Sequence, residues 1–485
     1  MYQPAGVKTS SEFPVPARMK AWVLGDPDEL LLRDKPTPVP GRAEVLVRID
    51  AVAICATDLE IIHGGSPASI GGGLPFNKDF TPGHEYMGTV AALGPGVDEF
   101  RIGERISVEI HAGCGQCKRC RQGMYTSCLN YGKPEKGHRA NGFTTDGGFA
   151  EYAVNHINTL ARVPDTMSDA EATLVVTAGT SMYGLTELGG LVAGESVVVI
   201  GPGPIGLLAV AVAKTLGASP VILTGTRSKR LAIGKELGAD RVINIAEENA
   251  VDVVKALTGG IGADYVVECA GTEATVNQAI HMVNRGGKIC LAAFPHDPVT
   301  IDLPHLVKNN IYVYGIRGEG RSATRRAMAL MAEKRFDATK IHTHTFALAD
   351  LPTALRYARD RVEDAIKVVV HPADVDASRH GGGLETKKSP PANLRAGSRK
   401  IAPLRTASAR PTCATRIVQS PKGPTGLFQR RIDRCEFGVE VAAQAVDHGD
   451  DGKADACGDQ AIFDRGGSRF VCPKLGKNIF HFTSW

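Results

Sequence analysis

The sequence predicts an α/β protein in which a β-rich domain precedes a doubly wound parallel sheet. Up to about Thr177 the chain consists of short apolar runs, such as EVLVRIDAVAI and GTVAALG, separated by Gly and Pro turns. This pattern is typical of an irregular β barrel or sandwich. From Ala178 onward strands alternate with helices, so that SVVVI precedes IGLLAVAVAKTLG and VILTG precedes KRLAIGKELG. Such alternation predicts a parallel sheet with helices on both faces.

The last 113 residues differ in composition from the rest of the chain. Of the 56 basic and 52 acidic residues, 18 and 12 lie from Ala373 onward, which leaves the preceding body with 38 and 40. A nearly neutral body argues against nucleic-acid binding by that part. Because residues 379–431 are basic and lack apolar periodicity, we expect residues 373–485 to form a disordered tail. A basic arm for an acidic partner and a segment translated out of frame are alternative interpretations.

The chain carries no pattern for export or membrane insertion. The N-terminal MYQPAGVKTSSEFPVP has no apolar h-region, and we expect residues 1–18 to be a loose extension before the first strand, MKAWVL. The uncharged run 197–213 is interrupted by GPGP, which favours a strand, a turn and a buried helix over a membrane span. Four of the 11 cysteines lie within 15 residues, which indicates metal binding rather than disulfides. We therefore expect a cytoplasmic protein.

The clustered cysteines have the spacing C-x2-C-x2-C-x7-C; they are Cys114, Cys117, Cys120 and Cys128. Four thiolates on one loop can enclose a tetrahedral Zn²⁺ and leave no open position, which makes the predicted zinc structural. An iron–sulfur cluster is the alternative, because its bacterial pattern also begins C-x2-C-x2-C. That pattern continues x3-C-P, whereas here the gap is seven residues and Leu129 follows the last cysteine.

A second candidate metal site is scattered along the β-rich part. Cys55 lies in CATD, and His84 and Glu85 lie in TPGHEY. Each motif alone is ordinary, because a buried cysteine is usually a small apolar residue. Together, on a β domain that precedes a dinucleotide fold, they predict an open catalytic zinc site that activates a substrate hydroxyl as a Lewis acid.

The third motif is a glycine-rich turn between a strand and a helix. Gly201, Gly203 and Gly206 form G-x-G-x-x-G directly after SVVVI and open the following helix. The first glycine permits a tight turn, the second lets a pyrophosphate approach the backbone, and the third lets helix and strand pack closely. The sequence therefore predicts a dinucleotide-binding site in which the phosphates of the cofactor face the N-terminus of this helix.

In order and spacing, these motifs resemble the zinc-dependent medium-chain alcohol dehydrogenases, in particular the threonine and polyol (sorbitol-type) branch. The segments that carry the resemblance are CATD, GHEY, the four-cysteine lobe, GGFAEY and GPGPIG, and it covers roughly Met19 to Pro372. It implies a GroES-like catalytic domain over 19–177 with two zinc sites, a Rossmann domain over 178–317, and a return to the catalytic domain over 318–372. It also implies hydride transfer between a secondary alcohol or polyol, or the matching ketone, and a nicotinamide cofactor, in a homodimer or homotetramer.

The resemblance assigns roles residue by residue. Cys55 and His84 match the catalytic zinc ligands, and Glu85 matches a residue that binds zinc directly in some members and indirectly in others. Thr57 matches the hydroxyl that passes the alcohol proton toward solvent, and His111 a histidine near the substrate pocket of the threonine enzymes. The residues that match dinucleotide or nicotinamide contacts are Ile205, Arg230, Ala292, Ala293, Phe294, Ile316 and Arg317.

Two family positions hold unexpected residues. The fourth zinc position, acidic or Cys in relatives, falls on Val176 or Thr177, so we expect water or substrate to fill more of the coordination sphere. The relay histidine of the family is replaced by Glu60, which can still accept a proton or can be a solvated charge. His63 is an alternative relay.

The cofactor-selecting position is a third departure. NAD enzymes place an acidic residue at the end of the second strand to hold the ribose 2′-hydroxyl. Here Gly225 stands at that position, followed by Thr226 and Arg227. A small residue leaves room for a 2′-phosphate, and Arg227 can bind it through charge-assisted hydrogen bonds. The sequence thus favours NADP(H) over NAD(H), with an unselective pocket as the alternative.

Three other functions stay open. His111 favours an L-threonine 3-dehydrogenase, while Val176, Thr177 and Glu60 are compatible with a non-catalytic dinucleotide-binding or redox-sensing protein. An iron–sulfur electron carrier is the third. The glycine-rich loop 64–80 is expected near the entrance of the site, and the identity of the small-molecule substrate does not follow from the sequence.

Overall fold

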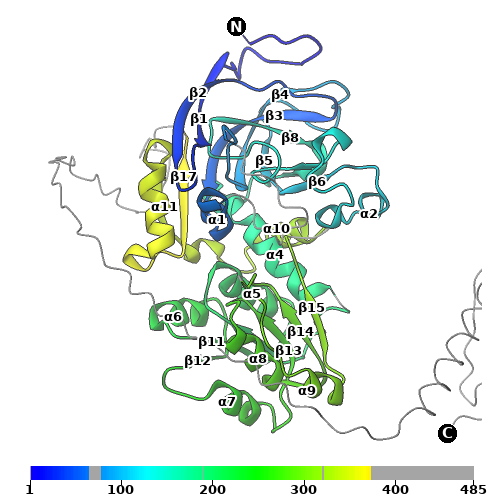
Figure 1. Cartoon of the computed structure of the whole chain (residues 1–485), viewed down its shortest axis with the longest axis vertical. Helices are drawn as coiled ribbons and strands as arrows, with labels where there is room; N and C mark the ends of the chain where they lie inside the picture. The colour runs from blue at the N-terminus through cyan, green and yellow to red at the C-terminus, as the bar shows by residue number, and fades with distance from the viewer. Residues whose placement is uncertain (1, 65–77, 188, 296, 319–321, 373–485) are drawn as a thin grey trace, which may run out of the picture. The chain divides into compact units, whose positions relative to one another are not determined.

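The computed structural model describes residues 2–64, 78–187, 189–295, 297–318 and 322–372 (Figure 1). All described residues belong to one compact unit, residues 1–390. The tail predicted over 373–485, and residues 65–77 of the loop predicted near the entrance, lie outside the described residues.

The β-rich part is built around one seven-stranded mixed sheet with the order β16-β17-β3-β4-β5-β9, in which β8 also pairs with β3. Its strands are β3 (Glu44–Ala53), β4 (Glu85–Leu93), β5 (Arg105–Val108), β8 (Tyr152–His156), β9 (Leu160–Arg162), β16 (His342–Ala347) and β17 (Lys367–His371). Strand β3 is apolar on both faces because Leu46 and Val47 pack into separate cores. The last described strands, β16 and β17, complete this sheet, because β17 pairs with β3.

Two small sheets and several helices accompany this sheet. The small sheets pair β1 (Arg18–Leu24) with β2 (Leu30–Pro36), and β6 (His111–Gly113) with β7 (Arg139–Ala140). The helices are α1 (Ala56–Gly64), α2 (Lys118–Arg121), α3 (Asp169–Thr173), α4 (Val175–Thr186), α10 (Ala323–Ala332) and α11 (Leu351–Asp360).

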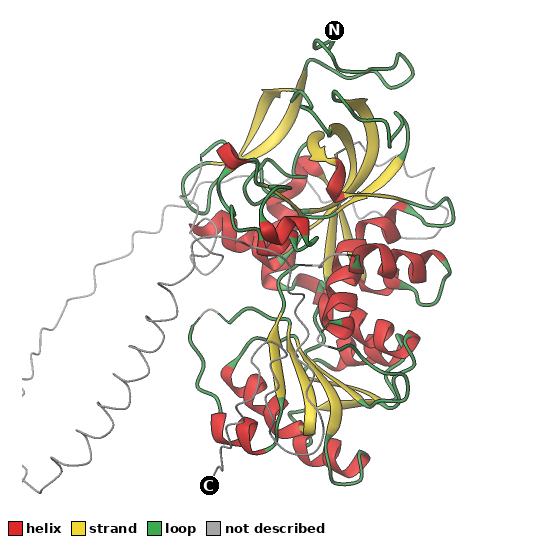
Figure 2. Cartoon of the chain, turned by 90° about the vertical axis from the view of Figure 1, so that its right-hand side faces the viewer, coloured by secondary structure: helices red, strands yellow, loops and turns green. Residues whose placement is uncertain are grey.

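The second part is the predicted doubly wound sheet, which is confirmed. Six parallel strands follow the order β12-β11-β10-β13-β14-β15. They are β10 (Val197–Ile200), β11 (Val221–Gly225), β12 (Arg241–Asn244), β13 (Ala263–Glu268), β14 (Val283–Leu291) and β15 (Tyr312–Gly315). The helices that follow them are α5 (Pro204–Thr215), α6 (Ser228–Glu236), α7 (Ala250–Leu257), α8 (Glu273–Met282) and α9 (Leu303–Lys308), on both sides of the sheet (Figure 2).

Strand β10 explains why the sequence shows a continuous apolar run rather than alternation. Val197 and Val199 pack into a core that contains residues of α5, whereas Val198 and Ile200 pack into a second core that contains residues of α7 and α8. A strand covered on both faces has no polar side, as expected for the centre of a parallel sheet.

Helix α4 connects the two parts through a shared core. Ser181 on α4 donates a hydrogen bond of 2.8 Å to the carbonyl of Ile205 on α5. The same core cluster holds Ala53 and Met87 of the mixed sheet together with Val199 of the parallel sheet. The domain boundary predicted between residues 177 and 178 falls inside this helix.

The N-terminal extension is packed rather than loose. The backbones of Lys8 and Leu93 exchange hydrogen bonds of 2.9 and 3.0 Å, and Tyr2 donates to the carbonyl of Pro38 at 2.6 Å. Tyr2 and Val7 lie against a core cluster that includes Met19. Hydrophobic burial thus fastens a segment whose sequence lacks a regular period. None of the helices in the described ranges has the length and apolar character needed to cross a bilayer.

Candidate active site

Adjacent strand ends bring the three scattered metal-binding candidates together. Ala53 of β3 pairs with Glu85 of β4, so Cys55, just past β3, faces the start of β4, which His84 immediately precedes. One ligand atom from each of Cys55, His84 and Glu85 lies within 4.8 Å of the others. Cys55 is half-buried and the other two are buried. The predicted triad therefore forms one compact cluster.

The carboxylate of Asp58 orients two members of this cluster. Fully buried in the first turn of α1, it accepts a hydrogen bond of 2.8 Å from the backbone N–H of Cys55 and lies 2.9 Å from Nδ1 of His84. This contact leaves Nε2 of His84 available to a metal, the usual arrangement of a histidine ligand held by a carboxylate. Burial alone would lower the pKa of His84, but Asp58 and Cys55 raise it well above its usual value.

Glu85 is held by a buried lysine from the far end of the fold. Lys367, the first residue of β17, forms an ion pair with Oε2 of Glu85, and both side chains are nearly inaccessible to solvent. Thr177 donates a hydrogen bond of 3.2 Å to the same oxygen. Burial by itself would lower the pKa of Lys367, but the charges of Glu85 and Cys55 raise it. Of the two residues at the fourth zinc position, Thr177 thus contacts the cluster, while Val176 packs with Ile110 and Ala140.

The donor set of this cluster suits zinc. A bound metal would displace the proton of His84 and leave its imidazole neutral; Cys55 as thiolate, the carboxylates of Asp58 and Glu85 and the ammonium of Lys367 then give an excess of two negative charges. A divalent cation cancels that excess, and sulfur, imidazole and carboxylate are the ligands that zinc takes in open sites. Cys55, His84 and Glu85 can therefore hold a zinc ion with further positions left for water or substrate.

The proposed proton-relay residues lie in two places. Thr57 contacts the cluster directly, since its Oγ1 is 3.9 Å from the sulfur of Cys55. Glu60 and His63 instead line a pocket of about 940 Å³ beside α11, whose lining residues do not include Cys55 or His84. There His63 contacts Asp28 at 2.9 Å. Of these three residues, Thr57 is the one with a described contact to the Cys55–His84–Glu85 cluster.

The four clustered cysteines also converge. One sulfur from each of Cys114, Cys117, Cys120 and Cys128 lies within 4.8 Å of the others. Backbone N–H groups point at the sulfurs, for example Cys120 N–H to Cys117 at 3.4 Å, and this hydrogen bond lowers the pKa of Cys117 to about 6. Asn130 donates to Cys114 through its side chain at 3.3 Å. Such donors stabilise thiolates, the form that binds metal, whereas burial raises the pKa of Cys120 and Cys128. The convergence of the four sulfurs means that the lobe can hold a closed four-sulfur zinc.

The glycine-rich turn has the geometry that its sequence predicts. Gly201 has a φ of +100°, which side chains disfavour, and a Cβ on Gly206 would lie 2.0 Å from the carbonyl oxygen of Gly201. Gly203 precedes the twelve-residue helix α5, and no side chain caps that end. Free N–H groups at a helix N-terminus are a phosphate site. Ile205 lies in the first turn, with its carbonyl bonded to Ser181.

The end of β11 shows why an acidic residue is absent there. A Cβ on Gly225 would lie 2.4 Å from Cδ of Pro202, so the proline ring occupies the space that an Asp side chain would need. Beyond Gly225 the exposed Thr226 leads to Arg227, the half-buried N-cap of α6.

Arg227 belongs to a cluster of three arginines. Burial, with the charges of Arg227 and Arg361, lowers the pKa of Arg230 to about 10, and burial and Arg227 likewise lower the pKa of Arg361. Buried Arg230 donates to the carbonyl of Ala365 at 2.5 Å. Arg227 and Arg361 form no ion pair with any carboxylate of the described residues, while nearby Asp364 pairs with Lys229 at 2.5 Å. The cluster therefore has positive charge to offer to an anion.

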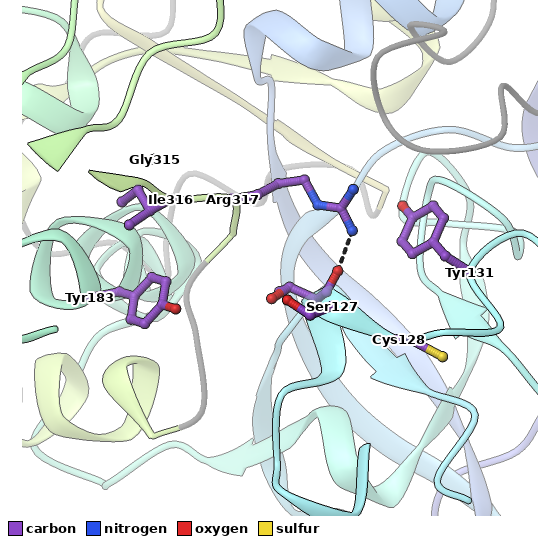
Figure 3. Close-up of a pocket in the computed structure, with 8 residues that line it drawn as sticks. Ser127, Cys128, Tyr131, Tyr183, Gly315, Ile316 and Arg317 are labelled. Atoms are coloured by element: carbon purple, nitrogen blue, oxygen red, sulfur yellow. Dashed lines mark hydrogen bonds between the residues drawn. The ribbon is translucent and has the colours of Figure 1, made fainter. Parts of the chain in front are cut away.

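The residues expected around the nicotinamide follow the ends of β14 and β15. Ala292 is half-buried and Phe294 is exposed, whereas Ile316 and Arg317 line a pocket of about 420 Å³ (Figure 3). Arg317 reaches across this pocket, donates to the carbonyl of Thr126, and stacks on the ring of Tyr131 at 4.5 Å. No carboxylate of the described residues pairs with Arg317.

Aromatic rings connect His84 to His111. The ring of Phe143 lies 4.8 Å from that of His84 and 5.8 Å from that of His111. Burial, with the charge of Arg317, keeps the pKa of His111 well below its usual value, so this histidine is neutral. Its buried Nδ1 has no hydrogen-bond partner among the described residues. It is thus a free buried acceptor or donor near the metal cluster.

Sequence reasoning missed several residues of this site. Asp58 had a signal, because it follows Cys55 within CATD and a ligating histidine commonly needs a carboxylate partner. Lys367, Arg361 and Phe143 had none, since each reaches the site only through long-range strand pairing or loop packing.

Comparisons with known proteins agree with this geometry. Residues 41–165 match the family model described as the alcohol dehydrogenase GroES-like domain, and residues 204–333 match the zinc-binding dehydrogenase model. The chain is 31% identical over 359 residues to the sorbitol dehydrogenase of Bacillus subtilis strain 168, covering 74% of this chain and 98% of the relative. It is 32% identical over 329 residues to the L-threonine 3-dehydrogenase of Pectobacterium carotovorum, covering 68% and 92%.

Solved structures with similar folds carry either nicotinamide cofactor. A zinc-binding dehydrogenase of Sinorhizobium meliloti 1021 bound to NADP is similar with a TM-score of 0.64 and 28% identity, covering 74% of this chain and all of that one. An alcohol dehydrogenase of E. coli CFT073 complexed with NADH gives a TM-score of 0.65 and 25% identity, covering 73% and all of that chain.

Replacing Asp58 tests the orientation of the cluster. Asp58→Asn removes the charge beside His84, so we expect the zinc affinity of the Cys55–His84 cluster to fall about 10–100-fold. The measurement is zinc retained against a competing chelator. Asp28→Asn, which alters the matched contact of exposed His63, is the control. Equal zinc retention in Asp58→Asn and wild type would contradict this account.

Replacing Lys367 tests the buried ion pair. In protein stripped of zinc at this cluster, Lys367→Met leaves Glu85 buried without a counter-charge, which costs about 3–5 kcal/mol of unfolding free energy. Lys367→Met/Glu85→Gln removes both charges and recovers most of that loss. Urea denaturation measures the unfolding free energy of the single and the double variant. The control is Lys340→Met, which breaks an exposed ion pair and should lower the unfolding free energy by under about 1 kcal/mol. A Lys367→Met protein as stable as the Lys340→Met control would refute this assignment.

Proposed function

The chain belongs to the zinc-dependent medium-chain alcohol dehydrogenases, and on this basis we propose that Cys55, His84 and Glu85 form its catalytic zinc site and that NADP(H) is its preferred cofactor. The protein is a zinc-dependent oxidoreductase of alcohols or polyols. The observation that carries the site assignment is the convergence of a thiol, an imidazole and a carboxylate within 4.8 Å beside a dinucleotide-type turn. A second zinc, held by the four-cysteine lobe, has a structural role.

The residues of the site divide the work of hydride transfer. Bound at Cys55 and His84, zinc would supply Lewis-acid polarisation of the substrate oxygen. Asp58 fixes the ring of His84, and Lys367 holds the carboxylate of Glu85 in place through their ion pair. Thr57, beside Cys55, would relay the alcohol proton: its Oγ1 accepts that proton and its own hydroxyl proton passes on toward solvent, as hydride leaves the substrate carbon for the nicotinamide. Ala292, Phe294, Ile316 and Arg317 would border the nicotinamide, with Gly201 and Gly206 shaping the turn under the pyrophosphate.

The NADP(H) preference rests on steric and electrostatic grounds. The ring of Pro202 fills the space that an acidic side chain at position 225 would need. With glycine there, no carboxylate at this position repels a 2′-phosphate. Arg227 and Arg361 have no carboxylate partner among the described residues and can bind the phosphate by charge-assisted hydrogen bonds.

L-Threonine 3-dehydrogenase activity is a second candidate, favoured by His111. Its neutral imidazole is buried near the metal cluster with Nδ1 unpartnered among the described residues. Such a nitrogen can accept a hydrogen bond from the amino group of an amino alcohol.

We also infer a cytoplasmic homodimer or homotetramer. The described cysteines are free thiols, which suits a reducing compartment. Edge strand β15 and neighbouring α9 expose large apolar side chains, a surface suited to a second copy. These side chains are Leu303, Val307, Tyr312 and Val313.

The activity itself is tested with a panel of secondary alcohols, polyols and L-threonine, following nicotinamide reduction. We expect turnover with at least one polyol or secondary alcohol, two zinc ions per chain, and loss of activity to background in Cys55→Ala with one zinc retained. Cys290→Ala, a buried thiol outside both clusters, should remain active. Nucleotide binding without turnover, with one zinc in the wild type, would support the non-catalytic alternative instead.

Cofactor selection is tested by kcat/KM for NADP and NAD. The wild type should prefer NADP, and Arg227→Ala or Arg361→Ala should each lower kcat/KM for NADP about 10- to 150-fold, since each removes a charged hydrogen bond worth about 1.5–3 kcal/mol. Arg359→Ala, whose arginine pairs with Asp360, is the matched control. A wild-type preference for NAD would exclude the proposal.

The contact between Pro202 and Gly225 makes a separate prediction. Gly225→Asp alone forces the new side chain into the proline ring, so we expect weaker use of both cofactors. Gly225→Asp/Pro202→Ala provides space for the carboxylate and should prefer NAD. Conversion to NAD preference by Gly225→Asp alone would show that the proline does not block this position.

A further inference from the structure

A third group of metal-type ligands lies in the parallel-sheet part, outside both clusters described above. His281 is on α8, Asp302 directly precedes α9, and His305 is in the first turn of α9. One ligand atom from each lies within 4.8 Å of the other two. The side chains of His281 and Asp302 are about 39% exposed, so an ion can reach them from solvent. This group plays no part in the proposed hydride transfer.

Hydrogen bonds hold the three residues in place before any ion binds. Asn277 on α8 accepts from the backbone N–H of Asp302 at 3.1 Å and donates to the carbonyl of Thr300 at 2.8 Å. Glu273, also on α8, accepts from the N–H of Thr300 at 2.9 Å. The segment before α9 is thus fastened to α8, which fixes Asp302 beside His281. A preformed arrangement reduces the ordering cost of binding.

The contacts among the three side chains leave donors for a cation. Oδ1 of Asp302 accepts from the N–H of His305 at 3.0 Å, while Oδ2 lies 3.5 Å from Nε2 of His281. The two imidazole rings meet edge to face with centroids 4.7 Å apart. Each imidazole offers a ring nitrogen that can bind a metal in its neutral form.

We infer that His281, Asp302 and His305 form a third metal site, for a divalent first-row transition ion such as Zn²⁺, that joins α8 to α9. Two imidazoles and one carboxylate suit zinc, nickel, cobalt or copper and discriminate against Mg²⁺ and Ca²⁺, which prefer oxygen ligands. Water completes the coordination. Lys255 and Lys308 oppose a cation near His305, and only one carboxylate compensates, so the affinity is micromolar and weaker than at the cysteine cluster.

The test is a zinc titration by calorimetry of the full chain, dialysed so that tightly held zinc stays bound. Wild type should take up one further zinc with micromolar affinity, and thermal unfolding should shift upward by about 2–4 °C at saturating zinc. His281→Gln/His305→Gln should weaken this uptake roughly tenfold or more and abolish the shift. His63→Gln, which breaks a single exposed His–Asp contact, should behave as wild type.

Asp302→Asn separates metal binding from folding, because an asparagine can still cap α9 through its side-chain oxygen. We expect the Asp302→Asn variant to keep the wild-type melting temperature without added zinc. Its affinity for the one further zinc ion should fall strongly. Mg²⁺ at the same concentration should give no shift. Equal zinc uptake by wild type, Asp302→Asn and the double histidine variant would show that the three residues form only an ion pair and a ring contact.

Discussion

The buried carboxylate of Asp58 is the contact on which the proposed active site depends. It accepts a hydrogen bond from the backbone N–H of Cys55 and contacts Nδ1 of His84. A single carboxylate thus sets the position of one proposed zinc ligand and the ring orientation of the other. A carboxylate can remain charged in the interior only when it is paired. Asp58 is paired with His84, and a divalent cation bound between the sulfur of Cys55 and the imidazole would add positive charge to the same cluster.

The site is completed by the last strand of the fold. Strand β17 returns to the mixed sheet after the chain has formed the parallel sheet, and places Lys367 against Glu85. The same returning segment brings Arg361 close to Arg227 and lets Arg230 bind the carbonyl of Ala365. Both the ion pair of Glu85 and the arginine cluster proposed for the cofactor therefore depend on this returning segment. The β-rich part and the parallel-sheet part also share a core through α4.

The sequence predicted what local spacing encodes. The four cysteines, the glycine turn and the strand–helix alternation lie within short segments. CATD and GHEY meet because the end of β3 lies beside the start of its antiparallel neighbour β4. Lys367 and Phe143 were not predictable, since a lone lysine or phenylalanine carries no signal of its long-range neighbours. The role of Gly225 was predicted from its missing side chain, but the reason, the ring of Pro202, needed coordinates. The packed N-terminal extension was missed because its few apolar residues have no period.

The most direct test of the central claim is anomalous diffraction at the zinc edge from crystals of the full chain grown with NADP. A peak between the sulfur of Cys55 and Nε2 of His84, in addition to one inside the four-cysteine lobe, is the result we expect. An active preparation whose crystals show density only in the lobe, with the imidazole of His84 turned away from Cys55, would contradict it.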